Sequence, residues 1–153
     1  MNVALFQPEI PQNTAAILRT LACFGAEAHI VGPAAFNLSE RAQRRAGLDY
    51  AQTVPLTHHT TFEAFQSAMP GRIVLLTTGA ETLLHDFAFD QSDTLLFGRE
   101  SAGVPETVHA AASARVRIPL MPQARSLNLA VAVGIALMAA YLSSGAITTK
   151  GLR

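Results

Sequence analysis

Short runs of apolar residues alternate along the chain with stretches in which apolar residues recur every three or four positions. Short, nearly continuous apolar runs are typical of strands that are covered on both faces of a sheet, whereas the longer period is typical of amphipathic helices. The pattern predicts strands at 2–6, 27–31, 72–78, 93–98 and 116–119. It predicts helices at 13–24, 39–46, 60–69, 105–111 and from about residue 127 onward.

Residues that start or stop helices support several of these boundaries. Asn13 is a candidate N-cap and Gly25 a candidate stop for the first helix, and Pro105 suits the first turn of another. Strands that alternate with helices predict an α/β fold with a mostly parallel sheet flanked by helices. Because the 153 residues show no repeat, low-complexity segment or linker, we expect a single domain over residues 1–153.

The composition favours a folded cytoplasmic protein. Half of the residues are apolar and 14% are charged, which argues against disorder. The longest uncharged apolar run, 129–142, is too short and too rich in Ala and Gly for a membrane span, so no membrane partner is expected. The N-terminus lacks the basic residues of a signal peptide, and Cys23, the single cysteine, excludes an intrachain disulfide. We expect Cys23 to pack on the apolar face of its helix.

The net charge is zero, so no overall basic field indicates a nucleic acid partner. The distribution is less even, because Arg41, Arg44 and Arg45 lie close together. Two interpretations stay open at this point: the three arginines form a basic face for a polyanion, or they line the solvated side of a short helix.

Polar and small residues follow three of the predicted strands. The run 72–78 ends in TTGAE, 93–98 is followed by RESAGVP, and 116–119 continues into LMPQARSLN. Ligands of parallel α/β sheets bind beyond the carboxyl ends of the strands. These three loops therefore predict a site at one edge of the sheet.

Familiar nucleotide and metal motifs are absent from this edge. Gly98 and Gly103 have the spacing of a phosphate-binding loop, but Val104-Pro105 replaces its Lys-Ser/Thr pair. No GxGxxG follows the first strand. The adjacent His58 and His59 cannot easily face one ion and are interpreted as loop residues, so no metal is expected.

The polar residues of these loops have two possible roles. Glu100 lies between glycines after a buried strand, where it is either an anchor for a helix N-terminus or a functional group. Ser126 and Asn128 precede the last helix and are candidate caps, with Ser126 well placed. Capping does not account for Arg125 or Glu100 in neighbouring loops.

Three longer segments carry a resemblance to a known family. IPQNTAAILRT, LFGRESAGVP and IPLMPQARSLNLAVAVGIAL resemble the three ordered motifs of the SPOUT RNA methyltransferases. The segment RRAGLDY and the short chain make it most similar to the small tRNA (cytidine/uridine-34 2′-O)-methyltransferases. The resemblance extends over nearly the whole chain.

The resemblance implies a fold, a cofactor and a reaction. The fold is a sheet whose C-terminal segment forms a deep trefoil knot. The reaction is 2′-O-methylation of the ribose of tRNA nucleotide 34, with S-adenosylmethionine as donor and S-adenosylhomocysteine as product. By position, the family's cofactor contacts match Leu76, Gly98, Ile118 and Ser126. Two alternatives stay open: methylation of another tRNA or rRNA nucleotide, and an RNA-binding protein without catalysis.

The resemblance also implies roles for other residues. Arg19, Glu100, Ser126 and Asn128 match the catalytic positions, and Asn13 matches a residue that shapes the first loop. Arginine is a poor base, since its pKa lies above about 12, so Arg19 is expected to hold a phosphate or to stabilise charge on the reacting oxygen. The expected contacts with the tRNA anticodon loop are Arg41, Arg44, Arg45 and Arg125.

The last helix carries two apolar stripes and indicates a homodimer. At 100° per residue, one stripe comprises Leu127, Val131, Ile135, Met138 and Leu142, and the other comprises Leu129, Val133 and Leu137. A surface helix needs one apolar stripe, so two predict burial on both sides. Either the domain covers both, or a second copy covers one.

Overall fold

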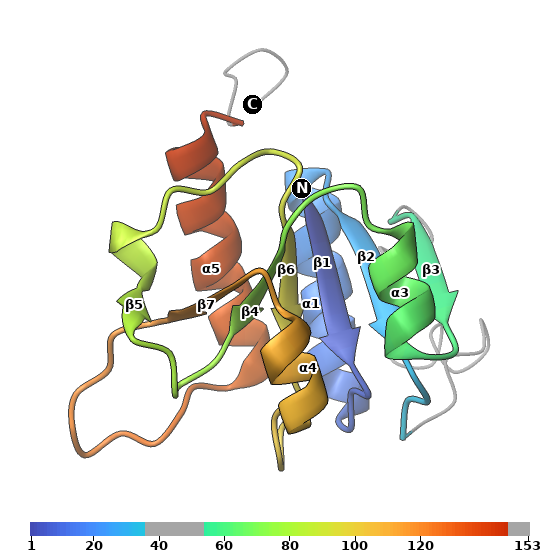
Figure 1. Ribbon diagram of the computed structural model, residues 1–153, viewed down its shortest axis with the longest axis horizontal. Helices are drawn as coiled ribbons and strands as arrows, with labels where there is room; N and C mark the ends of the chain where they lie inside the picture. The colour runs from blue at the N-terminus through green and yellow to red at the C-terminus, as the bar shows by residue number, and fades with distance from the viewer. Residues whose placement is uncertain (36–53, 147–153) are drawn as a thin grey trace.

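The computed structural model describes residues 1–35 and 54–146, which form a parallel sheet with helices on both faces (Figure 1). In this part of the chain the sheet has seven strands in the order β3-β2-β1-β6-β4-β7-β5. The strands are β1 (Asn2–Phe6), β2 (Glu27–Val31), β3 (Leu56–His59), β4 (Ile73–Leu76), β5 (Thr82–Leu83), β6 (Thr94–Phe97) and β7 (Ala114–Arg117). The helices are α1 (Pro11–Phe24), α3 (Phe62–Ala68), α4 (Glu106–Ala111) and α5 (Leu129–Ser144), with a short 3-10 helix η1 (Leu84–Asp86).

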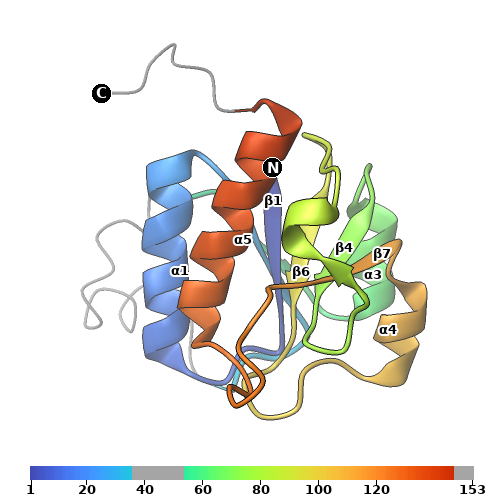
Figure 2. The same cartoon turned by 90° about the vertical axis from the view of Figure 1, so that its left-hand side faces the viewer.

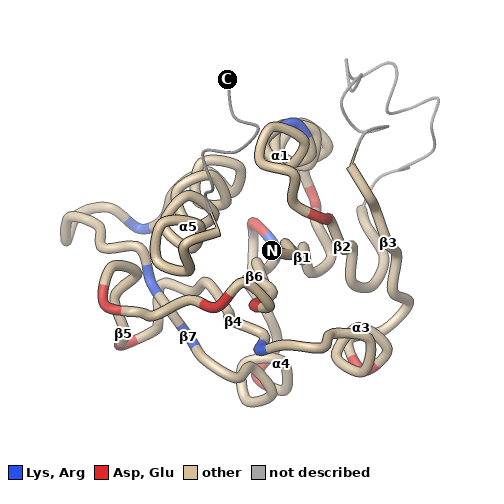
Figure 3. The backbone as a smooth tube through the Cα atoms, turned by 90° about the horizontal axis from the view of Figure 1, so that it is seen from above, with Lys and Arg blue, Asp and Glu red and all other residues tan. Residues whose placement is uncertain are grey.

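Alternate residues of the inner strands face two separate layers of core. Figure 3 shows α1 and α5 on one face of the sheet and α3 and α4 on the other. Val3 and Leu5 of β1 pack into the cluster that contains the buried residues of α1 and α5. Ala4 and Phe6 pack into the cluster that contains Phe65 of α3 and Val108 of α4. Both faces of these strands are covered, which explains their nearly continuous apolar runs.

The α/β prediction and its parallel sheet are confirmed, and most boundaries move by only a few residues. The last predicted strand, 116–119, is observed at Ala114–Arg117. Helix α1 begins at Pro11, so Asn13 lies inside its first turn; the N-cap is Ile10, which makes no side-chain capping bond. The prediction of Asn13 as a cap is therefore wrong, because its side chain bonds to other segments. Gly25 ends α1 with a positive φ of 65°, as expected.

Two edge strands escaped the sequence pattern. Leu56–His59 forms β3 beside β2, so the interpretation of His58 and His59 as loop residues is wrong. The side chain of His59 is buried and its Nε2 lies 3.0 Å from Nδ1 of His29 in β2. The run LTHH lacks the apolar character of the inner strands because β3 is an edge strand with exposed central residues. Strand β5 has only two residues.

Two further expectations need correction. Cys23 is exposed on α1, because the buried side of that helix is formed by Thr14, Ile17, Leu18 and Leu21. Asn128, rather than Ser126, caps α5, which begins at Leu129. The trefoil knot stays a prediction. The predicted helix 39–46 and Arg41, Arg44 and Arg45 lie outside the described residues. No helix in the described ranges is long and apolar enough to cross a membrane.

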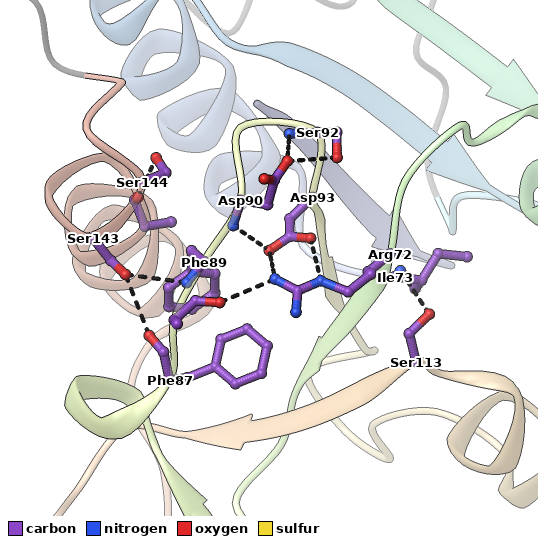
Figure 4. A network of polar contacts seen from close by, with 12 residues as sticks. Arg72, Ile73, Phe87, Phe89, Asp90, Ser92, Asp93, Ser113, Ser143 and Ser144 are labelled. Atoms are coloured by element: carbon purple, nitrogen blue, oxygen red, sulfur yellow. Dashed lines mark hydrogen bonds and ion pairs between the residues drawn. The ribbon is translucent and has the colours of Figure 1, made fainter.

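Polar contacts at the amino ends of β4 and β6 tie this side of the sheet to α5 (Figure 4). Arg72 donates from Nε and a terminal nitrogen to the fully buried carboxylate of Asp93, at 2.8 and 2.7 Å, and to the Ala88 carbonyl at 3.0 Å. The hydroxyl of Ser143 in α5 accepts from Phe89 N at 3.1 Å. These contacts fix the segment before β6 at the amino edge of the sheet. The loops that follow the strands lie at the opposite, carboxyl edge.

Candidate active site

The loops after β4, β6 and β7 meet at the carboxyl edge of the sheet, which is the lower edge in Figure 1. They enclose a pocket of about 510 Å³ together with the first turns of α1 and α5. Small-molecule sites have volumes of roughly 300–1,000 Å³. The three loops proposed from the sequence are therefore brought together around one space of suitable size.

Most of the predicted site residues line this pocket. They are Asn13, Leu76, Gly98, Glu100, Ile118, Ser126 and Asn128. Arg19 and Arg125 are not among its lining residues; both are exposed, Arg19 on α1 and Arg125 in the loop before α5. Within one chain, the structure assembles the predicted cofactor contacts but does not bring Arg19 to them.

Glycines shape the loop after β6. The backbones of Arg99 and Gly103 exchange two hydrogen bonds of 2.9 Å, so the loop folds back directly over Gly98. A Cβ atom at Gly98 would lie 2.5 Å from the carbonyl carbon of Gly103, and Gly103 has a φ of 63°. The G-x-x-x-x-G spacing therefore serves a tight backbone approach, and both positions need glycine.

Glu100 joins this loop to the segment that follows β1. Its Oε2 accepts from the backbone N–H of Glu9 at 3.0 Å, and its Oε1 accepts from Asn13 Nδ2 at 3.1 Å. Glu9 returns the contact, because its carboxylate accepts from the hydroxyl and the N–H of Ser101 at 2.7 and 2.9 Å. These bonds from Ser101 hold the pKa of Glu9 below its usual range. The carboxylate of Glu100 thus fixes the segment after β1, and the carboxylate of Glu9 fixes the loop after β6.

Asn13 extends the link to the last helix. Its Oδ1 accepts from Asn128 Nδ2 at 2.9 Å, while Asn128 Oδ1 accepts from the N–H groups of Ala130 and Val131 at 2.9 and 3.4 Å. Asn128 therefore caps α5, as one interpretation of the sequence proposed, and contacts the first motif at the same time; its catalytic role stays a prediction. The chain Glu100–Asn13–Asn128 connects all three motifs.

The pocket can hold a nucleoside with a polar tail. Leu75, Leu76, Ile118 and Leu120 supply apolar side chains for a base, while loop backbones supply donors and acceptors for its edge. The lining also includes polar side chains: Thr77, Thr78, Arg99, Ser126 and His109. No group of three or more potential metal ligands occurs among residues 1–35 and 54–146.

Comparison with known proteins decides the family. Residues 1–138 match the SpoU rRNA Methylase family. The chain belongs to this family. The resemblance inferred from the three sequence motifs is thereby confirmed.

Individual relatives of this SpoU family member are similar over nearly the whole length of this chain. A tRNA (cytidine(34)-2′-O)-methyltransferase of Beijerinckia indica subsp. indica is 52% identical over 148 residues, 95% of this chain and 92% of that protein. A solved structure on the 2-OH methylation of C/U34 on tRNA matches with a TM-score of 0.87 and 43% identity, over 93% of this chain and 94% of that one. An AdoMet-bound rRNA methyltransferase of Sinorhizobium meliloti matches with a TM-score of 0.82 and 29% identity, over 92% of this chain and 55% of that one.

The sequence interpretation of this SpoU site missed several residues. Glu9 and Ser101 hold its loops together, and Arg99, Thr77 and His109 line its pocket. Glu9 follows β1, so the rule that selected the other three loops would have selected its segment as well. Its pairing with Ser101 has no sequence signal, because the two residues are 92 positions apart.

Proposed function

We propose that this protein transfers a methyl group from S-adenosylmethionine to the ribose 2′-hydroxyl of the wobble nucleotide, position 34, of tRNA. The observation that carries the proposal is the pocket formed jointly by the three family motifs at the carboxyl edge of the sheet. It is supported by the relatives named for cytidine-34 methylation, at 52% identity, and by the solved structure concerned with C/U34. A tRNA substrate agrees with the cytoplasmic location expected from the sequence.

Cofactor binding is assigned to the residues of the three loops. Leu76, Gly98 and Ile118 line the apolar part of the pocket, and Ser126 lines it from the segment before α5. The AdoMet-bound S. meliloti relative supports this choice of ligand. When bound, the cofactor supplies an electrophilic methyl group on a sulfonium, and S-adenosylhomocysteine is the product.

The remaining polar residues position the loops and the ribose. Both oxygens of Glu100 accept hydrogen bonds, one from Glu9 N and one from Asn13, so its proposed role is to hold the site in shape rather than to accept the proton. The side chain of Arg19 is a guanidinium, which offers hydrogen-bond donors and a positive charge but no acceptor. Its proposed role is to bind a phosphate next to the reacting ribose, or to stabilise negative charge on the 2′-oxygen.

A homodimer is part of the same proposal. The first apolar stripe of α5 is exposed in the single chain: Leu127 36%, Val131 50%, Ile135 40%, Met138 40% and Leu142 64%. The second stripe faces the sheet, with Val133 and Leu137 completely buried. An exposed apolar stripe of this length is unfavourable in water. A second copy of the chain would cover it and place residues such as Arg19 of one chain beside the pocket of the other.

Methyl transfer from labelled S-adenosylmethionine to tRNA tests the function directly. Unmodified tRNA transcripts are incubated with protein and cofactor, and 2′-O-methylation is mapped by nucleotide. We expect a single methylated ribose at position 34 in a subset of tRNAs. Methylation at another position would show that the protein has a different RNA target. No methyl transfer to any tRNA or rRNA would favour the alternative of an RNA-binding protein without catalysis. The proposed contacts with tRNA phosphates are Arg125, Arg41, Arg44 and Arg45. Replacing these arginines by Glu reverses their charge and should weaken tRNA binding.

A further inference from the structure

Arg99 is a partly buried cation that the proposed chemistry has not used. It follows Gly98 and lines the pocket. Its backbone is fully engaged with Gly103, whereas its guanidinium Nε is shielded from solvent and has no hydrogen-bond partner in the described part of the chain. A shielded donor without an acceptor is unfavourable, and in a pocket it indicates a missing ligand group.

The neighbouring carboxylates are already engaged by other donors. The positive charge of Arg99 contributes to lowering the pKa of Glu9, so the two groups lie near one another. The oxygens of Glu9 nevertheless accept from Ser101, and those of Glu100 accept from Glu9 N and Asn13. Among residues 1–35 and 54–146, no acidic side chain forms an ion pair with Arg99. The buried Nε of Arg99 is therefore left without an acceptor among residues 1–35 and 54–146, and a ligand in the pocket could supply one.

The chemistry of the guanidinium selects the acceptor. Arginine binds planar carboxylates through paired N–H donors, more strongly than a neutral donor would. Arg99 is the one Lys or Arg among the residues that line the described pocket. S-Adenosylmethionine carries a single carboxylate, at its amino-acid end. A phosphate of a folded RNA reaches exposed donors more easily than a shielded Nε, so the small ligand is favoured.

We propose that Arg99 binds the carboxylate at the amino-acid end of S-adenosylmethionine and of its product. The proposal rests on the proposed function and names the residue that holds the polar end of the cofactor. Leu76, Gly98 and Ile118 would hold the adenosine end, so the two ends of one ligand have separate determinants.

Two ligands that differ only at the amino-acid end test this assignment. S-Adenosylhomocysteine carries the carboxylate, whereas 5′-methylthioadenosine has the same adenosine and thioether without it. Both are titrated calorimetrically into the wild type, into Arg99→Gln and into the matched control Arg115→Gln, which removes an exposed arginine of β7 that does not line the pocket. Loss of a charge-assisted contact is expected to weaken S-adenosylhomocysteine binding about ten- to hundredfold in Arg99→Gln. Methylthioadenosine binding should stay within about twofold, as should both ligands in Arg115→Gln.

The other outcomes have distinct meanings. Equal losses for the two ligands would overturn the proposal, since Arg99 would then only shape the loop. Unchanged binding of both, with a raised KM for tRNA, would also overturn it and assign Arg99 to a phosphate. If circular dichroism shows that Arg99→Gln does not fold, Arg99→Lys replaces it, because lysine keeps the charge without the paired donors. In that variant too, only the affinity for S-adenosylhomocysteine should fall. A folded wild type that binds neither ligand would instead reject the proposed function.

Discussion

Glu100 is the residue at which the segments after β1 and β6 meet. Its two oxygens accept from a backbone N–H that cannot reorient and from a side-chain amide that can. The amide of Asn13 is in turn constrained, because its oxygen accepts from Asn128. A change of one carboxylate oxygen therefore affects groups in all three motifs.

Replacement of Glu100 by Gln should impair the site without removing a base. The new NH2 group faces either Glu9 N–H or Asn13 Nδ2, and both are donors, so a destabilisation of about 1–3 kcal/mol is expected. Methyl transfer should fall by about tenfold, with an unchanged pH–rate profile. Loss of a general base typically costs roughly 10²- to 10⁴-fold, so a loss of that size together with a flattened profile would identify Glu100 as the proton acceptor. The measurements are chemical denaturation and single-turnover rates between pH 6 and 9.

Arg19 offers a test that separates chemistry from cofactor binding. The proposed role of Arg19 predicts that Arg19→Ala abolishes methyl transfer. Because Arg19 is exposed on α1 and does not line the pocket, the affinity for S-adenosylhomocysteine should stay within about tenfold, or ~1.4 kcal/mol. Calorimetry and a methyl-transfer assay on the same preparation check this. Full activity of the variant would exclude Arg19 from the mechanism.

At the scale of elements, the edge of the sheet formed by β2 and β3 contains a buried histidine pair. His29 and His59 are 6% and 9% exposed, and their rings pack against Phe65 of α3. The two nitrogens 3.0 Å apart share one proton well, but two protonated rings would place N–H groups against each other. Burial lowers the pKa of both residues; His59 further lowers that of His29, which Glu27 opposes, and His58 further lowers that of His59.

This pair should make folding sensitive to mild acid. At pH values above the ordinary histidine pKa of about 6.5, both histidines are neutral in the folded and in the unfolded chain, and the free energy of unfolding has its full value. As the pH falls below this value the unfolded chain binds protons that the folded chain refuses, so stability decreases, by at most about 1.4 kcal/mol per pH unit for each histidine. The decline ends below the lowered folded pKa values. Urea unfolding at pH 7.5, 6.5 and 5.5 should show this slope, and it should be shallower in His29→Leu/His59→Leu. Parallel profiles would remove the pair as its cause.

The elements also show which parts of the structure a sequence can predict. The inner strands β1, β4 and β6 are covered on both faces, and their apolar runs identified them. The edge strand β3 carries exposed polar residues, because only neighbours in space decide that it pairs with β2. In the site, the rule for carboxyl ends of strands selected the loops that line the pocket. The partners of Glu100 were not predictable, since they depend on contacts 87 and 91 residues apart.

At the scale of the whole molecule, α5 lies beside α1 on one face of the sheet and leaves its other side uncovered (Figure 2). The exposed stripe begins at Leu127, just before the cap of α5, and continues along the helix to Leu142. Its first residue also lines the pocket, so the surface and the site are continuous. Coverage of the stripe by a second chain would therefore also complete the surroundings of the pocket.

Charging each stripe in turn tests the homodimer. Met138→Arg places a charge on the exposed stripe and should yield a folded monomer with little methyl transfer. Val133→Arg places the charge at a position that is 0% exposed and should unfold the chain. Light scattering gives the mass, and circular dichroism reports folding. A wild-type protein that is monomeric at micromolar concentration would refute the dimer.

The link Glu100–Asn13–Asn128 has a consequence for synthesis on the ribosome. Asn13 emerges early, but its two partners follow 87 and 115 residues later. Until Asn128 and α5 have emerged, Asn13 lacks one of its two partners and the pocket lacks one wall. A nascent chain that has completed β1, β2, β4 and β6 thus still lacks the full pocket, however well its sheet has formed. Ligand affinity should arise late and abruptly during translation, and chains stalled before α5 should bind none.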